Sequence, residues 1–193
     1  MTTKQLGYFA LIGAPCLAIG LGLEALNGGP IRSAWMGVWG VLYISGWMAA
    51  IIALRRLGVL EAEDPTKRRF GRVVGQIILV TLTLANVLNV WEVIAPTYKP
   101  TFYYLFDLGW PVSNLMMLAV GVVVLRANQL RGWMRWIPLL VGLWLPVVLL
   151  IKNVPSLAYM PHIYSAVAWS LLALVVISKA AQQQRHYSLE VSR

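Results

Sequence analysis

The chain has 193 residues, of which 59% are hydrophobic and only 12% are charged, and its formal net charge is +9. A soluble domain carries about a quarter charged residues, so this composition excludes an ordinary water-soluble protein. Nine tryptophans and eight tyrosines fit the aromatic belts of membrane interfaces. In such a protein the basic residues of the loops orient the chain, so their excess does not indicate nucleic-acid binding.

Six segments meet or approach the roughly 20 apolar residues that a transmembrane helix needs. We expect spans at residues 6–26, 34–54, 73–95, 103–125, 136–151 and 159–178. The fifth is the weakest, because it is short and contains Pro138 and Pro146. The first follows Lys4 but exceeds the roughly 7–15 apolar residues of a secretory signal, so we expect a retained helix. The sequence therefore predicts an all-α integral membrane protein, in which residues 1–193 form a single bundle of six transmembrane helices.

Lysine and arginine are distributed unevenly between the two sides of this bundle. If the N-terminus is cytoplasmic, thirteen of the sixteen Lys and Arg lie on the cytoplasmic side, and only Arg32, Lys99 and Lys152 lie outside. Cytoplasmic loops carry such an excess. We therefore expect a multi-pass protein of the cell membrane with cytoplasmic N- and C-termini.

The predicted cytoplasmic side has two polar segments, the basic loop 55–72 and the tail 179–193. Within the loop, Asp64 and Pro65 have the order of an N-cap followed by proline at the first helical position, so the third helix begins near the interface. We expect anionic lipid headgroups to contact the basic residues that follow, because lysine and arginine near a membrane surface attract them. These residues are Lys67, Arg68, Arg69 and Arg72.

The polar residues of the spans gather on the predicted outer side. Glu24, Glu92 and Asp107 all fall near the outer ends of helices, and ionisable groups at this depth usually face a cavity or one another. We expect a polar pocket in the outer half of the bundle that opens outward. The ligand-binding candidates are Glu92, Asp107, Asn89, Asn86, Asn114, Trp91, Trp110, His162, Lys152 and Glu24.

Structural roles explain several of these residues equally well. Glu92 with Lys152 or His162 fits an ion pair that only holds helices together. Glu24 fits contact with outer headgroups. Asp107 fits stabilisation of a helix N-terminus. The asparagines fit hydrogen bonds between helices.

The sequence assigns no catalytic residue, metal site or cofactor. Cys16 is the single cysteine, so neither a disulfide nor a cysteine metal site is expected. The two histidines fall on opposite predicted sides, which excludes a histidine pair around a haem. No P-loop or H-E-x-x-H motif occurs.

Three functions are compatible with these features. The first is binding or transport of a small cationic or amphipathic ligand, or of a proton, through the outer pocket. The second is a membrane enzyme acting on a lipid-like substrate, with acid–base chemistry at Glu92, Asp107 and His162. The third is a non-catalytic subunit or scaffold, which would pack through the small residues Ala10, Ala14, Ala18 and Gly22. The sequence does not choose between them and assigns no oligomeric state.

Overall fold

The computed structural model describes residues 1–26, 34–151 and 153–191, and all regular structure in these ranges is helical. In chain order the elements are α1 (Thr3–Gly13), α2 (Cys16–Leu26), α3 (Ala34–Arg56), α4 (Pro65–Ile94), α5 (Thr101–Asp107), α6 (Gly109–Ala127), η1 (Gly132–Trp136), α7 (Ile137–Gly142), α8 (Trp144–Ile151), η2 (Pro155–Leu157) and α9 (Met160–Val191).

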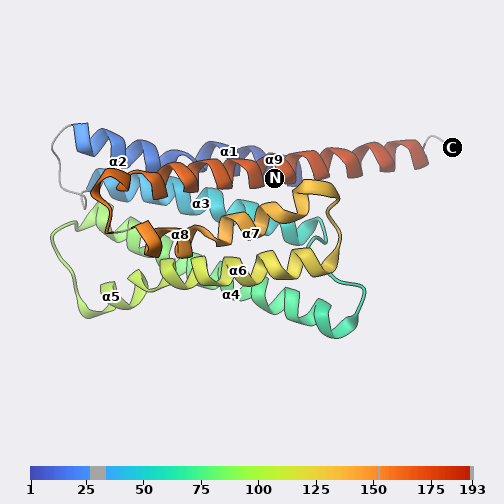
Figure 1. The fold of residues 1–193 in the computed structure, drawn as a ribbon, viewed down its shortest axis with the longest axis horizontal. Coiled ribbons are helices and arrows are strands. Elements are labelled where there is room, and N and C mark those ends of the chain that lie inside the picture. Colours follow the sequence, from blue (N-terminus) through green and yellow to red (C-terminus); the bar gives the residue numbers. More distant parts are fainter. Residues whose placement is uncertain (27–33, 152, 192–193) are drawn as a thin grey trace.

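The long helices lie side by side along one axis, and the connections between them alternate between the two ends of the bundle (Figure 1). One end carries Glu24, Glu92 and Asp107, and we call it the carboxylate end. The other end carries Arg55 and Arg72, and we call it the arginine end. Alternation of this kind gathers residues that are far apart in the sequence at one level of the bundle.

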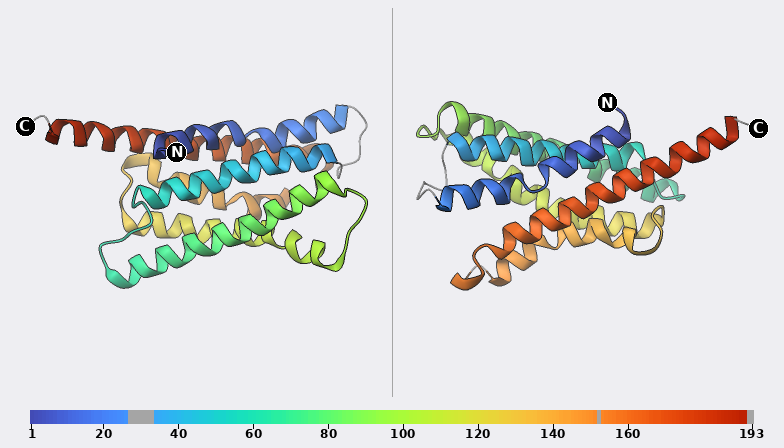
Figure 2. Two further views of the ribbon diagram at one scale, coloured as in Figure 1. Left: turned by 180° about the vertical axis from the view of Figure 1, so that it is seen from behind. Right: turned by 90° about the horizontal axis from the view of Figure 1, so that it is seen from above.

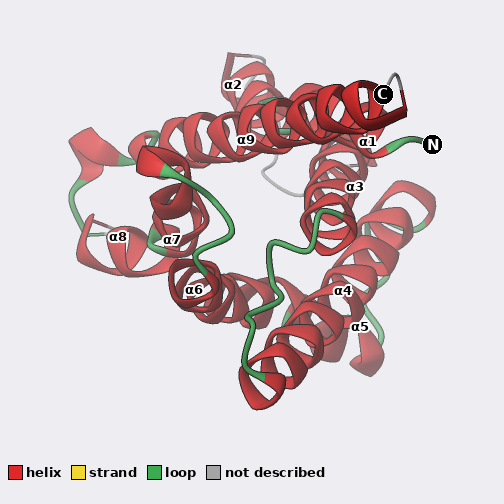
Figure 3. Ribbon diagram, turned by 90° about the vertical axis from the view of Figure 1, so that its right-hand side faces the viewer, coloured by secondary structure: helices red, strands yellow, loops and turns green. Residues whose placement is uncertain are grey.

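Neighbouring helices form a closed ring in the order α9, α1, α3, α4, α6 and α7, with α7 again packing on α9 (Figure 3). Viewed from above, α9 crosses the other helices at an angle and extends past them at the arginine end (Figure 2). The interior of this ring holds fully buried apolar side chains, including Ile51, Leu54 and Leu172.

Proline explains why three of the helical stretches are interrupted. Proline has no N–H to donate to the carbonyl four residues earlier, and its ring crowds that carbonyl. Pro111 and Pro146 lie four residues after Asp107 and Gly142, where α5 and α7 end. Pro15 lies between the end of α1 and the start of α2. The axes on either side of the α7–α8 break differ by 48°.

The outer surface of the bundle is apolar at mid-helix, although it faces away from the core. Val80 on α4, Leu115 on α6 and Val167 on α9 are each more than half exposed. Among the described residues, five helical stretches are long and apolar enough to cross a membrane, or six if the bent α7–α8 pair is one span. An apolar exterior on helices of this length belongs in a bilayer, so the protein is a helical multi-span membrane protein.

The start of α4 agrees with the cap predicted from the sequence. Asp64 precedes the helix, Pro65 is its first residue, and the Asp64 carboxylate accepts a hydrogen bond from the Lys67 backbone N–H at 2.9 Å. This hydrogen bond lowers the pKa of Asp64. The helix therefore begins eight residues before the apolar segment that predicts it, and its first two turns are basic.

Small residues bring α1 and α3 into backbone contact. A Cβ atom added to Gly13 would lie 2.9 Å from the Gly46 Cα. Ala10 and Ala14 are buried, whereas nothing lies within 4 Å of the position of a Cβ on Gly22. The small residues in the first half of the first predicted span therefore pack inside the bundle, whereas Gly22 near its end does not.

Candidate functional site

A cavity of about 250 Å³ opens at the carboxylate end, between α2, α3, α4, α5, α6 and α9. Five of the residues predicted from the sequence line it, namely Asn89, Glu92, Asp107, Trp110 and His162. The fold therefore brings together side chains from four helices that span more than seventy positions of the sequence.

Helical periodicity places the lining residues of α4 on one face. Ala85, Leu88, Asn89 and Glu92 have the spacing i, i+3, i+4 and i+7, and all four line the cavity. Residues at this spacing share one side of an α-helix. The lower part of this face is apolar, and its last turn carries the amide and the carboxylate.

Two glycines on α3 allow α4 to approach closely at the level of Asn89. A Cβ added to Gly40 would lie 2.5 Å from the Asn89 Oδ1, and one added to Gly37 would lie 2.7 Å from the Asn89 carbonyl oxygen. The Asn89 amide is therefore held against the α3 backbone. Gly40 also lines the cavity, so the absence of a side chain there shapes its wall.

Glu92 has a buried hydrogen-bond donor beside it. The Tyr103 hydroxyl donates to Glu92 Oε1, and the Tyr103 side chain is 1% exposed. The Lys99 Nζ lies 5.4 Å from the centroid of the Tyr103 ring. The Tyr103 hydroxyl therefore holds the Glu92 carboxylate in place at the cavity wall.

Asp107 reaches the cavity because the helix is interrupted there. It is the last residue of α5, and Leu108 is the N-cap of α6. The sequence places Asp107 at the start of the fourth predicted helix, whereas in the structure it ends the short helix α5 that precedes α6. Trp110 follows in the first turn of α6, lines the cavity, and contacts the Trp144 ring with a centroid separation of 4.7 Å.

His162 enters the cavity from the first turn of α9. The Trp144 indole N–H donates a hydrogen bond of 2.8 Å to the Pro161 carbonyl oxygen. This bond fixes the backbone beside His162. The His162 Nδ1 atom is buried and has no hydrogen-bond partner among the described residues. A buried polar atom without a partner is costly, so this nitrogen is suited to a ligand or to water in the cavity.

Below these residues the cavity is closed by polar and aromatic contacts between α3 and α9. The hydroxyl oxygens of Tyr43 and Ser165 are 2.6 Å apart, and both side chains are buried. One turn further along α3, the Trp47 ring lies 4.3 Å from the Trp169 ring, centroid to centroid. Tyr43 lines the cavity, so this layer is its floor.

The remaining sequence candidates do not line this cavity. The Asn86 amide donates to Ser45 Oγ at 3.0 Å, and the Asn114 amide donates to the Trp110 carbonyl oxygen at 2.9 Å. The Trp91 indole N–H donates to the Tyr98 carbonyl oxygen at 2.9 Å. Glu24 lies in the last turn of α2, and Lys152 lies outside the described residues.

Tyr43 and Gly40 line the cavity without having been singled out from the sequence. Both lie in a long apolar run, where a tyrosine fits an interface anchor and a glycine fits ordinary packing. Their spacing from Ile44 and Met36, which also line the cavity, is helical. No signal within α3 alone points to a site, because the polar groups that define it belong to other helices.

Within the described ranges, no group of three or more histidine, cysteine, aspartate or glutamate side chains is arranged to hold a metal ion. The chemistry of the cavity is therefore that of its carboxylates, one imidazole, one amide and aromatic rings. Such a set can bind a cation or exchange protons.

Together the fold and the cavity define a helical multi-span membrane protein with a cavity at one end of the bundle, whose largely apolar lining carries two carboxylates, an amide and an imidazole. Comparisons with protein-family models, with curated proteins and with solved structures give no match to this chain.

Proposed function

We propose that this protein binds a small cation or a small amphipathic amine in the cavity at the carboxylate end. One observation carries the proposal: Glu92 and Asp107 line the same cavity. Two carboxylates around one space favour a positive charge between them, and their partial burial strengthens that attraction. Trp110 and Tyr43 supply aromatic faces that suit an alkylammonium group.

We further propose six membrane crossings, with both termini in the cytoplasm and the cavity open to the outside. Support comes from the chain between α6 and α9, which must return from the arginine end to the carboxylate end. Residues 132–151 form η1, α7 and α8. At about 2.0 Å per residue for the 3₁₀ turn and about 1.5 Å for the α-helices, their summed length is roughly 30 Å, which the 48° bend between α7 and α8 shortens only slightly. This length is close to the thickness of a bilayer core.

The size of the cavity favours a small ligand. Pockets for drug-sized molecules are about 300–1,000 Å³, and this one is about 250 Å³. A compact amine fits that volume, whereas most of a phospholipid would remain outside it. This comparison favours binding of a small cation over the alternative of an enzyme that encloses a lipid-like substrate.

The floor of the cavity favours binding over conduction in this conformation. Tyr43 and Ser165 are hydrogen-bonded beneath it, and the Trp47 and Trp169 rings pack in the next layer. A transported ion would have to cross this layer and the fully buried side chains of Ile51 and Leu54.

The test is ligand-dependent melting of the purified full chain with a panel of inorganic cations, alkylamines and quaternary amines. Glu92→Gln and Asp107→Asn remove the two carboxylates with little change in shape. Glu24→Gln is the matched control, because it removes an acidic residue from the same end without touching the cavity. A hydrogen bond to a charged group contributes about 1.5–3 kcal/mol, so each cavity variant should weaken binding by roughly 10- to 150-fold.

Stabilisation of the wild type that survives in Glu24→Gln and disappears in Glu92→Gln supports the proposal. If no amine or cation stabilises the wild type, and both cavity variants lose stability without ligand, the polar cluster is structural. Turnover of a lipid substrate that is lost in His162→Ala would instead favour the enzyme.

A further inference from the structure

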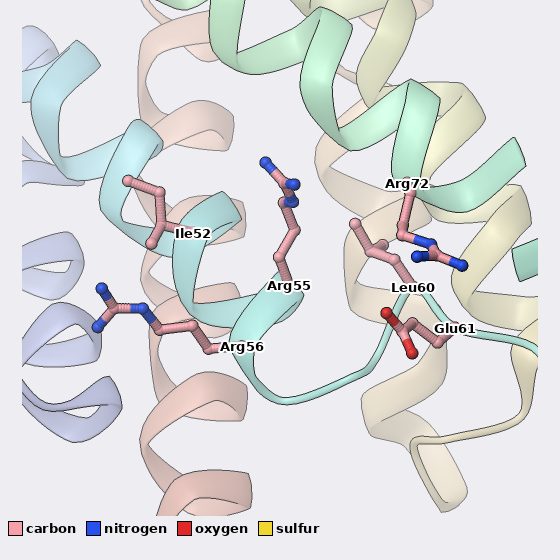
Figure 4. A pocket seen from close by; sticks show the side chains of 6 residues that line it. All are labelled: Ile52, Arg55, Arg56, Leu60, Glu61 and Arg72. Carbon is pink, nitrogen blue, oxygen red and sulfur yellow. The ribbon is translucent and has the colours of Figure 1, made fainter. Parts of the chain in front are cut away.

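A second cavity lies at the arginine end, opposite the carboxylate cavity. It has a volume of about 330 Å³ and is lined by Ile52, Arg55, Arg56, Leu60, Glu61 and Arg72 (Figure 4). Its charged lining residues are therefore three arginines and one glutamate. The lining comes from the last turn of α3, the connecting loop and the second turn of α4.

Both the aliphatic part and the guanidinium group of Arg55 contact α4. A Cβ added to Gly75 would lie 3.2 Å from the Arg55 Cδ, so the aliphatic part of Arg55 lies against the bare α4 backbone. Its guanidinium group donates from Nη1 to Gln76 Oε1 at 3.0 Å. Only one of the five N–H donors of arginine is used by this bond, so the other donors remain available at the cavity edge.

Arg72 faces the same space from α4. It lies four residues before Gln76, so the two side chains share one face of the helix. Arg72 forms no hydrogen bond or ion pair with any residue in the described ranges, and Figure 4 shows it beside Leu60 and above Glu61. The Arg72 guanidinium therefore retains all of its donors.

Arg56 and Glu61 have different parts in this cavity. The Arg56 Nη1 donates to the Met1 carbonyl oxygen at 2.9 Å, and Figure 4 shows its side chain extending away from Arg55. Glu61 places one negative charge next to Arg72. Arg55 and Arg72 are therefore the two lining arginines considered for an anion, with Glu61 as a competing charge.

We propose that Arg55 and Arg72 bind a phosphate group in this cavity. Guanidinium groups match the oxygen geometry of phosphate and bind it through two parallel hydrogen bonds. Ile52 and Leu60 add an apolar wall beside the charged groups, which suits a phosphate that carries an acyl chain. The occupant expected is the phosphate monoester headgroup of a membrane lipid at the arginine end, and a free phosphate shares the same headgroup chemistry.

This site is narrower than the basic strip expected from the sequence. Of Lys67, Arg68, Arg69 and Arg72, only Arg72 lines this cavity. Arg69 is exposed on the same helix and lines none of the cavities described above. General attraction to an anionic surface would use all four residues alike, whereas a defined phosphate site distinguishes Arg72 from Arg69.

Binding to the purified full chain in detergent can be measured with dioctanoyl phosphatidic acid, dioctanoyl phosphatidylcholine and inorganic phosphate as probes. Arg55→Gln and Arg72→Gln should each weaken phosphatidic acid binding at least about tenfold, the loss expected for a hydrogen-bonded charged contact. Arg69→Gln removes the same charge outside the cavity and should leave the affinity within about twofold of wild type.

Glu61→Gln provides a test that misfolding cannot imitate. It removes the competing carboxylate, so phosphatidic acid should bind several-fold more tightly than to the wild type. Equal losses in Arg69→Gln and Arg72→Gln, or no gain in Glu61→Gln, would overturn the proposal. Saturable binding of inorganic phosphate with the same arginine dependence, but no added affinity for phosphatidic acid, would support the phosphate site and identify a soluble phosphate as its ligand.

Discussion

Three glycines near the carboxylate cavity differ in what a methyl group would meet, so their replacement by alanine forms a graded series. Beside Gly22 on α2 nothing lies within 4 Å. A Cβ at Gly40 would lie 2.5 Å from the side-chain Oδ1 of Asn89, and a Cβ at Gly37 would lie 2.7 Å from the Asn89 backbone oxygen. The first methyl group meets open space, the second a side chain that can rotate, and the third a helix backbone.

These contacts set the expected order of stability. Gly22→Ala should gain up to about 1 kcal/mol, because alanine favours a helix over glycine. Gly40→Ala gains the same but displaces the Asn89 amide, at a cost of about 0.5–1.5 kcal/mol for a strained rotamer. Gly37→Ala must move α3 away from α4, and overpacking of this kind costs about 1–3 kcal/mol. Gly37→Ala should therefore be less stable than Gly22→Ala by about that amount.

The free energy of unfolding can be compared by titrating the three detergent-purified variants with a denaturing detergent, with far-UV circular dichroism as the readout. Amine binding is measured on the same samples. Gly40→Ala should stay folded yet bind amines more weakly, because the displaced Asn89 amide narrows the cavity. If Gly37→Ala unfolds no earlier than Gly22→Ala, the close approach of α3 and α4 is not a stabilising feature of the fold.

Three further expectations follow from individual contacts. Folding lowers the pKa of Asp64, so the stability contributed by this cap is fully present above the ordinary value of 3.8 and is lost as the pH falls through the lower folded value. Asp64→Asn keeps an acceptor oxygen and should abolish this acid-sensitive component in a pH series of melting curves. Tyr43→Phe leaves the buried Ser165 hydroxyl without its partner, which should cost about 1–3 kcal/mol of unfolding free energy, and a loss below about 0.3 kcal/mol would argue against the bond. Cysteines introduced at Asn153 and Lys99, in a chain whose native thiol has been replaced, should both react with an impermeant reagent from the cell exterior, and labelling of only one would contradict six crossings.

The residues of α4 that line the cavity could have been predicted from the sequence, but only by comparing their angular positions around the helix axis. At about 100° per residue, Asn89 lies about 60° from Glu92 around the axis, whereas Asn86 lies about 120° away. The observed contacts follow this angle: Asn89 lines the cavity and Asn86 bonds to Ser45. Distance along the helix, counted in turns below Glu92, does not separate the two amides.

The hydrogen-bonded pair at the cavity floor, Tyr43 and Ser165, could not be predicted from the sequence, for a different reason. Tyr43 and Ser165 are separated by 122 positions, and their polar neighbours in the sequence, such as Ser45 and His162, do not indicate that the two hydroxyl groups meet. The pairing depends on the crossing of α3 and α9 and on the rotation of both helices. The proline positions, in contrast, do mark where helices break, but the 48° bend between α7 and α8 depends on the packing of those short helices against α6 and α9.

The two proposed sites lie far enough apart to act independently in this conformation. Eleven residues of α3 separate Ile44, in the carboxylate cavity, from Arg55, which corresponds to about 16 Å along the helix. Between these levels Trp47 is 2% exposed and packs against Trp169. Effects of substitutions at sites this far apart usually add within about 0.3–0.5 kcal/mol. The double variant Glu92→Gln/Arg55→Gln should therefore bind amines like Glu92→Gln and phosphatidic acid like Arg55→Gln. A departure of more than about tenfold in either affinity would mean that the aromatic layer moves when one cavity is filled, and that the two ends of the bundle are coupled through α3.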